Sequence, residues 1–321
     1  MVKTNVHFPT DYNLLWDACR KVTEISVKLA GTADLSGWRK GLDWKKRIKA
    51  RYRTFQRVKK SGGKNKVFRL KKAAIDYLNL VEILAKKTSK FLVEFKAETL
   101  SQMLLYQELE YYYQMLLKHS DLLKRRIIKE ETIAHSEKMF SLFEPHTKWI
   151  SKGKAGIIAE LGQKQIIVTD QNHFIVYHQL IGDKPDSEFT IPVAKKLKQL
   201  FGERLYSLSY DKGFSSKHHI DTLEKLIPKA IIKQKGKATK ERKEIERNDE
   251  FRRLSNEHQA VESNINQLEY NGLDKCPDKG EKNFKRYVSL AVLSYNMHRL
   301  GKLIMQKKMK EKPKGRQKQA A

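Results

Sequence analysis

The chain has 321 residues, 40% of them hydrophobic, which is enough for one large domain or two smaller ones and excludes a disordered tail. Its 66 Lys and Arg outnumber 37 Asp and Glu, and the net charge of +29 favours a polyanion partner, nucleic acid before an anionic membrane. The two cysteines, Cys19 and Cys276, exclude a disulfide framework, and no stretch reaches the roughly 20 apolar residues of a membrane helix. We therefore expect a cytoplasmic protein that binds nucleic acid and no membrane; a ribosome-associated or merely basic protein is the alternative.

A strand and an amphipathic helix open the chain. Residues 2–8 alternate in polarity and include β-branched side chains, which predicts a strand. Pro9 ends this strand, and Asp11 is a candidate cap for the helix that follows. The apolar stripe of that helix comprises Leu14, Leu15, Ala18, Val22 and Ile25.

A long basic segment follows at residues 38–71. Apolar residues then recur at helical spacing over 66–95 and again over 98–127. Together, residues 35–135 are expected to form a block of antiparallel helices. The aromatic residues that interleave with the cations of the basic segment are Trp38, Trp44, Tyr52 and Phe55.

The pattern then changes to short β-rich runs at 156–161, 165–169 and 174–181. Residues 162–163 and 170–173 separate these runs as predicted turns. This part of the chain is expected to form a meander of antiparallel strands.

Elements of both kinds complete the chain. We expect a helix over 192–201, a strand over 205–210 and a helix over 248–268. The stretch 287–297 is apolar almost all round, which predicts a helix that is buried on every side. The basic end from residue 306 is predicted to be disordered. The order of these elements indicates a mixed α/β fold interrupted by a helical block.

Asp211 is a candidate site residue because it comes directly after the strand predicted over 205–210. A carboxylate at the carboxyl end of a strand points into the crevice where α/β sheets hold ligands. The Gly213 that follows permits a tight turn. The competing interpretation is that Asp211 is a turn or helix-cap residue.

Glu262 is the second candidate, one residue past Val261 and three before Ile265 on a predicted helix. At the edge of the buried stripe, its carboxylate could reach a neighbouring sheet, although a solvated glutamate is the commoner case. Carboxylates are hard oxygen ligands that suit Mg²⁺ or Mn²⁺. A basic protein that offers such a pair of acids is a candidate for phosphoryl transfer on DNA.

Several long segments, in order along the chain, resemble bacterial insertion-sequence DDE transposases, which we assign to the insertion-sequence type 4 group. The segments are TNVHFPTDYNLLWDACR near the start, SLFEPHTKWISKGKAG and AELGQKQIIVTDQNHFIVYHQLIGD in the middle, YDKGFSS around Asp211, and HQAVESNINQLEYNGLDKC with FKRYVSLAVLSYNMHRLG towards the end.

The resemblance implies an α/β, RNase H-like mixed sheet core interrupted by a large helical insertion. On this reading, 1–34 is a remnant of the first core strand and helix, and 35–135 is the basic insertion. Residues 136–304 form the remainder of the catalytic core, and 305–321 form the disordered tail.

By the same resemblance, Asp211 corresponds to the family's second catalytic Asp and Glu262 to its catalytic Glu, both as ligands of two Mg²⁺ or Mn²⁺ ions. The family's first Asp falls ahead of Met1, so we expect the chain to lack one of three acids and to be inactive or nearly so by itself. Asp11 and Asp17 match non-catalytic positions. The implied partners are transposon ends and target DNA, with a homo-oligomer assembling on DNA in the bacterial nucleoid.

Other residues are candidates for contact with DNA. Lys212 could reach a scissile phosphate, and His258, one helical turn before Glu262, could contact a phosphate or a metal-bound water. In the basic segment, Arg47, Lys49 and Arg51 are expected to contact phosphates while aromatic residues pack on sugars or bases. A solvated helix with a tryptophan-anchored core is the alternative for that segment.

Three other functions stay open on the sequence alone. A non-catalytic transposase relic would bind DNA in a salt-dependent way without cutting it. An RNase H-like nuclease would nick DNA without joining strands. A structural RNA-binding protein would prefer RNA, and the pair of acids counts against it.

Overall fold

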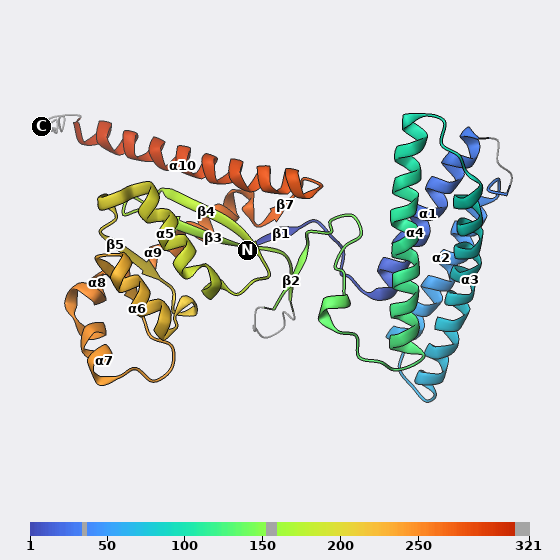
Figure 1. Cartoon of the computed structure of the whole chain (residues 1–321), viewed down its shortest axis with the longest axis horizontal. Coiled ribbons are helices and arrows are strands. Elements are labelled where there is room, and N and C mark those ends of the chain that lie inside the picture. Colours follow the sequence, from blue (N-terminus) through green and yellow to red (C-terminus); the bar gives the residue numbers. More distant parts are fainter. Residues whose placement is uncertain (34–36, 152–158, 312–321) are drawn as a thin grey trace, which may run out of the picture. The chain divides into compact units, whose positions relative to one another are not determined.

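The computed structural model describes residues 1–33, 37–151 and 159–311, which fall into two compact units (Figure 1). The sheet unit comprises Met1–Asn5 and the chain from His146 onward, and the helical unit is Val6–Pro145. The predicted mixed α/β class is confirmed. The functional boundaries proposed at residues 34, 135 and 304 stay predictions.

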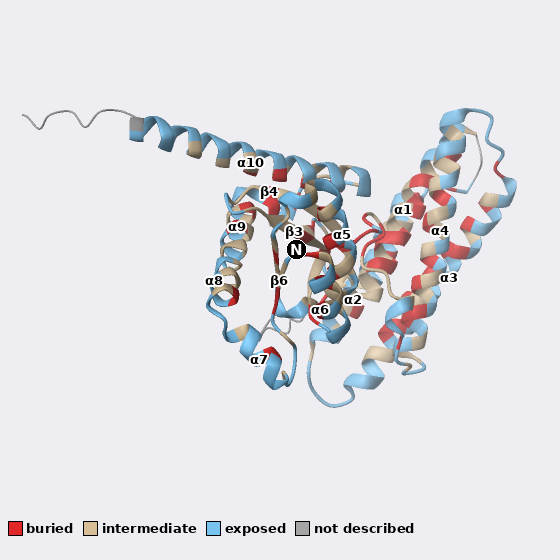
Figure 2. Ribbon diagram, turned by 60° about the vertical axis from the view of Figure 1, so that its left-hand side comes forward, coloured by how far each residue is buried: buried red, intermediate tan, exposed pale blue. Residues whose placement is uncertain are grey.

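Four long helices build the helical unit: α1 (Asp11–Thr32), α2 (Gly41–Lys60), α3 (Lys66–Glu94) and α4 (Leu100–Ile127). α1 packs against α4 and α2, and α3 packs against α2 and α4. Their buried residues face one another along the inside of the unit (Figure 2). The helices predicted over 66–95 and 98–127 are therefore confirmed.

The first helix begins one residue earlier than its predicted cap. Thr10 is the N-cap, and its side chain accepts a hydrogen bond from the Asn13 backbone N–H at 3.4 Å. Asp11 instead forms an ion pair with Arg126 of α4 at 2.9 Å. The apolar stripe of the helix is buried as expected: Leu14, Leu15, Ala18, Val22 and Ile25.

The sheet unit contains a five-stranded sheet and a separate pair of parallel strands. In the larger sheet, β3 runs antiparallel to β1, β2 and β4, and β1 runs parallel to β7. Its strands are β1 (Val2–Thr4), β2 (Lys148–Ile150), β3 (Glu160–Thr169), β4 (Ile175–Gly182) and β7 (Lys275–Cys276). The parallel pair is β5 (Ser207–Tyr210) and β6 (Lys229–Ile232).

Six helices accompany these strands: α5 (Thr190–Phe201), α6 (Lys217–Leu226), α7 (Lys240–Arg247), α8 (Asp249–Glu257), α9 (Ala260–Leu268) and α10 (Glu281–Glu311). Short helical turns of this unit lie at η2 (Asp186–Phe189), η3 (Gly202–Arg204), η4 (Lys212–Phe214) and η5 (Glu269–Leu273), whereas η1 (His135–Glu137) belongs to the helical unit. One apolar core joins Ile166 of β3 and Ile181 of β4 to Leu208 of β5 and to residues of α5 and α6. The two groups of strands are therefore packed on the same helices.

The predicted turn at 162–163 is wrong, because both residues lie inside β3. Gly162 pairs with Lys3 of β1 on one side and with Lys148 of β2 on the other. A Cβ atom at this position would lie 2.1 Å from the Val2 carbonyl oxygen, so the glycine permits close approach of two strands. Part of the strand predicted at 156–161 lies outside the described residues.

The turn predicted at 170–173 is confirmed. Oδ1 of Asp170 accepts hydrogen bonds from the backbone N–H groups of Asn172 at 2.9 Å and Phe174 at 2.8 Å. His173 takes a left-handed φ of 65°. This turn joins β3 to β4.

The expectation that 287–297 is buried all round is wrong, because the sheet covers only one face of α10. Phe284, Val288, Val292 and Tyr295 are buried there, whereas Leu293 is about half exposed on another face. The helix continues to Glu311, so the first residues of the predicted tail are helical. The rest of that tail, 312–321, lies outside the described residues. No helix in the described parts of the chain is both long enough and apolar enough to cross a membrane.

We expect Gly162→Ala to destabilise the sheet unit by about 1–3 kcal/mol, because the added methyl group meets backbone atoms of β1 that cannot rotate away. Thermal unfolding followed by circular dichroism measures this loss. Gly301→Ala is the control, since a Cβ there meets nothing within 4 Å in an exposed helix, and alanine favours helix. Equal melting temperatures for the two variants would contradict the close approach.

We also expect a pH-dependent loss of stability from His119 of α4. This side chain is fully buried, and neither ring nitrogen has a hydrogen-bond partner among the described residues. Burial, aided by the charge of Lys118, lowers the pKa of His119 from 6.5 to about 4. As the pH falls from 6.5 towards 4, the unfolded chain therefore binds a proton that the folded chain excludes, which costs about 2–3 kcal/mol by pH 4.5.

His119→Leu should remove this loss, and urea unfolding at pH 7 and pH 4.5 measures it. The control is His218→Leu, which removes an exposed histidine of the other unit. The explanation fails if the His119 variant loses as much stability on acidification as the parent.

Candidate active site

Asp211 lies at the carboxyl end of β5, as predicted. β5 and β6 pair in parallel, with Ser207 opposite Lys229, so both strands end at the same edge. Oδ1 of Asp211 accepts a hydrogen bond from the Lys212 backbone N–H at 2.6 Å and caps the turn η4. The cap interpretation is thus correct for one carboxylate oxygen, and the side chain as a whole is exposed.

The loop that follows β5 is held by neighbouring elements. The Tyr210 hydroxyl donates to the Thr190 carbonyl oxygen at 2.7 Å, and the Thr190 hydroxyl lies 3.0 Å from the Phe214 carbonyl oxygen. Oγ of Ser215 accepts from the Lys235 backbone N–H at 3.3 Å. These contacts tie the loop to the start of α5 and to the segment after β6, so its backbone is fixed in place.

The single helix predicted over 248–268 is wrong. α8 ends at Glu257 and α9 begins at Ala260, and His258 lies at the break between them. Nδ1 of His258 is 3.1 Å from Oγ of Ser209 in β5. This hydrogen bond attaches the start of α9 to the end of β5.

The same hydrogen bond joins the two elements that carry the candidate acids. Ser209 and Asp211 are two residues apart along an extended chain and therefore point to the same side. His258 and Glu262 are four residues apart at the start of a helix and therefore share a face. The contact between Ser209 and His258 therefore places the end of β5, which leads to Asp211, next to the start of α9, which carries Glu262.

The electrostatics of His258 agree with this arrangement. Partial burial lowers the pKa of His258, and the negative charges of Asp211 and Glu262 both act in the opposite direction. Both carboxylates therefore influence the imidazole, but among the described residues these three side chains do not gather closely enough to hold a metal ion.

The described residues fit a divalent metal only in part. Asp211 and Glu262 are exposed and offer the oxygen ligands that Mg²⁺ and Mn²⁺ prefer. However, no three His, Cys, Asp or Glu side chains gather closely enough to hold a metal ion anywhere in the described ranges 1–33, 37–151 and 159–311. Two acids alone leave the coordination of such an ion incomplete.

Lys212 is exposed beside Asp211, where its ammonium group is free to meet a phosphate. The other candidates for DNA contact belong to the helical unit. Arg47, Lys49 and Arg51 are all exposed on α2. The Arg47 guanidinium lies 5.0 Å from the centre of the Trp44 ring.

The aromatic residues of the basic segment are mainly structural. Trp38 and Phe55 are buried in the core of the helical unit, so neither can stack on a base. Tyr52 is partly buried and stacks on Trp16 with ring centres 5.6 Å apart. The alternative of a tryptophan-anchored core is therefore correct for Trp38, and the cations of the segment are left as its candidates for contact with DNA.

Sequence reasoning missed Ser209 and Asn264. Ser209 could have been found, because it is a polar residue on the same side of a predicted strand as Asp211. Asn264 is buried on α9, and its Nδ2 has no hydrogen-bond partner among the described residues. Nothing in the local sequence distinguishes it from an exposed asparagine.

Comparison with known families matches residues 129–297, just over half of the chain, to the transposase DDE domain. No curated protein and no solved structure is similar enough to count as a match. The matched stretch contains both Asp211 and Glu262, and it leaves most of the helical unit outside. The chain belongs to the DDE transposase domain family.

Proposed function

We propose that the chain acts in DNA transposition, cutting and joining phosphodiester bonds, with Asp211 and Glu262 as two of its metal ligands. The observation that carries this proposal is the hydrogen bond between Ser209 and His258, which attaches the helix of one acid to the strand of the other. The net charge of +29 supports DNA as the partner.

A divalent ion, when bound, supplies Lewis acidity to the phosphodiester and lowers the pKa of the attacking hydroxyl or water. The role of this chain's own groups is to hold and orient. Asp211 and Glu262 present oxygen ligands, and His258 holds α9 against β5 through Ser209. Lys212 offers a charge to the phosphate from the same loop.

A third ligand is needed, and the strand edges suggest where it belongs. In β3, the segment Gln165–Thr169 pairs with β4 on one side only, and β5 pairs only with β6 among the described strands. A strand antiparallel to β3 and parallel to β5 would join the two groups into an RNase H-like sheet. It would pass the end of β5, where Asp211 lies.

The remaining parts of the assignment stay predictions: the insertion-sequence type 4 subgroup, a homo-oligomer on DNA, and location at the nucleoid. The rival functions differ in their products. A relic binds element ends without cutting them under any metal, and a nuclease nicks DNA without strand-transfer products. No observation favours either rival.

We expect Asp211→Asn and Glu262→Gln each to weaken Mn²⁺ binding at least about tenfold, because each removes a charged ligand while keeping the side chain's size. Electron paramagnetic resonance of free Mn²⁺ in a titration of the full chain measures this. Asp221→Asn and Glu244→Gln are matched controls, since both acids are exposed elsewhere in the same unit. Equal Mn²⁺ affinity in all four variants would refute the ligand assignment.

We also expect the 321-residue chain to cleave its element's ends poorly on its own, because two carboxylates leave the ions short of ligands. Fusing a short β-forming segment that carries an Asp ahead of Val2 should produce Mn²⁺-dependent cleavage. The same segment with Asn in place of that Asp is the control. Cleavage that is equal with and without the added Asp would contradict a role for a third acid.

A further inference from the structure

The outward face of α2 carries one continuous row of cations. Lys46, Lys49, Arg53, Arg57 and Lys60 are all exposed, and they follow one another at intervals of three or four residues. In a helix of 3.6 residues per turn this spacing places them on a single face. We call these five residues the α2 cation stripe.

The core fixes which way the stripe points. Ile48 and Phe55 are fully buried on the opposite face of α2, against α1 and α3. The helix cannot rotate without exposing these two apolar side chains to water, which is unfavourable. The stripe is therefore held towards solvent by the packing of the helical unit.

The charges of the stripe are not neutralised within the chain. Among the described residues, the α2 cation that lies within ion-pair distance of a carboxylate is Lys45, which pairs with Glu24 at 2.6 Å and does not belong to the stripe. Asp43 is the one acid on α2. Neighbouring like charges at this spacing oppose helix formation.

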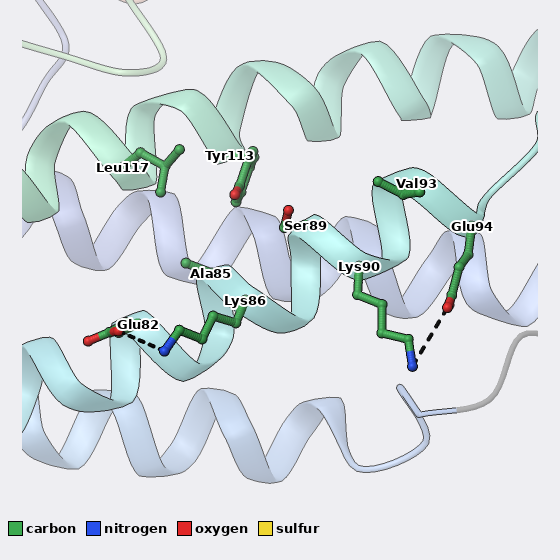
Figure 3. Close-up of a pocket in the computed structure, with 9 residues that line it drawn as sticks. All are labelled: Glu82, Ala85, Lys86, Ser89, Lys90, Val93, Glu94, Tyr113 and Leu117. Carbon is green, nitrogen blue, oxygen red and sulfur yellow. Dashed lines mark ion pairs between the residues drawn. The ribbon is translucent and has the colours of Figure 1, made fainter.

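The exposed face of α3 in the same unit shows the usual alternative (Figure 3). There Glu82 pairs with Lys86 at 2.9 Å, and Lys90 pairs with Glu94 at 3.7 Å, so that each cation has an acid one turn away. Such pairs are sufficient to keep a helix surface solvated. Among the residues that the structure describes, the cations of the α2 cation stripe are not paired with an acid in this way, and they repel one another.

We propose that the α2 cation stripe binds the phosphate backbone of double-stranded DNA without reading its sequence. From Lys46 to Lys60 the helix rises by about 21 Å, long enough to meet several successive phosphates. Lys and Arg contact phosphates as charges and as hydrogen-bond donors, and such contacts fix position but not sequence. The site lies outside the part of the chain that matches the transposase domain.

An anionic membrane is the less suitable partner. A helix that lies on a membrane buries an apolar face in the lipid. The apolar face of α2 is already occupied by the core, and on the outward face Leu42 in the first turn is the one large apolar side chain. The stripe therefore offers charge without a hydrophobic anchor.

The stripe differs from the set predicted from sequence. Of Arg47, Lys49 and Arg51, only Lys49 belongs to it. Arg47 and Arg51 lie towards one side of the helix, about 100° or more from the line through Lys46 and Arg53. Binding of DNA by the stripe rests on the proposed function in transposition. Its test measures binding and not catalysis, so DNA binding by the stripe and catalysis at Asp211 and Glu262 can be refuted separately.

The test compares two double variants of the full chain with the same loss of charge. Arg53→Ala with Arg57→Ala removes two stripe cations, and Lys86→Ala with Lys90→Ala removes two paired cations of α3. Fluorescence anisotropy with a labelled 30-base-pair duplex is measured between about 50 and 300 mM KCl. We expect the stripe variant to bind at least tenfold more weakly at 100 mM, and its salt slope to fall by nearly 2, since each phosphate contact contributes about 0.9.

A second variant separates binding from folding. Arg53→Glu introduces an acid one turn from both Lys49 and Arg57, which should leave the helix as stable as before or more stable. We expect its melting temperature to stay equal or rise while its affinity for the duplex falls by more than that of Arg53→Ala.

The proposal is overturned if the stripe and α3 variants lose affinity equally, because net charge alone would then explain binding. It is also overturned if Arg53→Glu binds the duplex like the parent chain. Vesicles with a high phosphatidylserine content are a further arm, and binding to them that depends on the stripe, without binding to the duplex, would assign the surface to a membrane instead.

Discussion

The proposed site depends on one hydrogen bond, between Oγ of Ser209 and Nδ1 of His258. It attaches the start of α9 to the end of β5 across a long stretch of chain. A net contribution of about 1 kcal/mol is typical for such a bond, so its importance lies in position rather than in strength. Other contacts also hold this part of the unit, among them the ion pair between Lys229 of β6 and Glu250 of α8 at 2.9 Å. The hydrogen bond is the contact that links the residue two before Asp211 to the residue four before Glu262.

The two units carry charges of opposite sign at their proposed functional surfaces. The sheet unit carries the two exposed candidate acids, Asp211 and Glu262, and like charges repel a polyanion unless cations accompany it. The helical unit holds a row of unneutralised positive charge on a rigid face. The proposed division is therefore that α2 binds the phosphate backbone of DNA, while the end of β5 and the start of α9 carry the metal ligands for cutting and joining it.

Local patterns in the sequence were sufficient for much of the fold. The helices of the helical unit follow from apolar spacing, and the turn at Asp170 follows from its residue types. Patterns failed where a second partner decided the outcome. The stretch 287–297 is apolar on all sides, yet the sheet covers one face of α10, and no sequence period shows how many faces are covered. Gly162 was predicted to turn the chain, whereas it lets β1 approach β3.

The candidate site was predictable in the same limited way. Asp211 could be placed because it ends an apolar strand, and Glu262 because the segment around it resembles a known family. The link between their elements could not be predicted, since the contact between Ser209 and His258 depends on a break between α8 and α9 that the helical pattern hides. Nor could the sequence predict that Asn264 is buried with an Nδ2 that has no hydrogen-bond partner in the described part of the chain. Long-range contacts of this kind are set by tertiary packing, which a single sequence does not display.

The measurement that tests the account most directly is a crystal structure of the chain soaked in Mn²⁺, with the metal located by its anomalous scattering. The account predicts a Mn²⁺ ion coordinated by the carboxylates of both Asp211 and Glu262, beside an intact contact between Ser209 and His258. A map in which the two carboxylates lie too far apart to share an ion would contradict it.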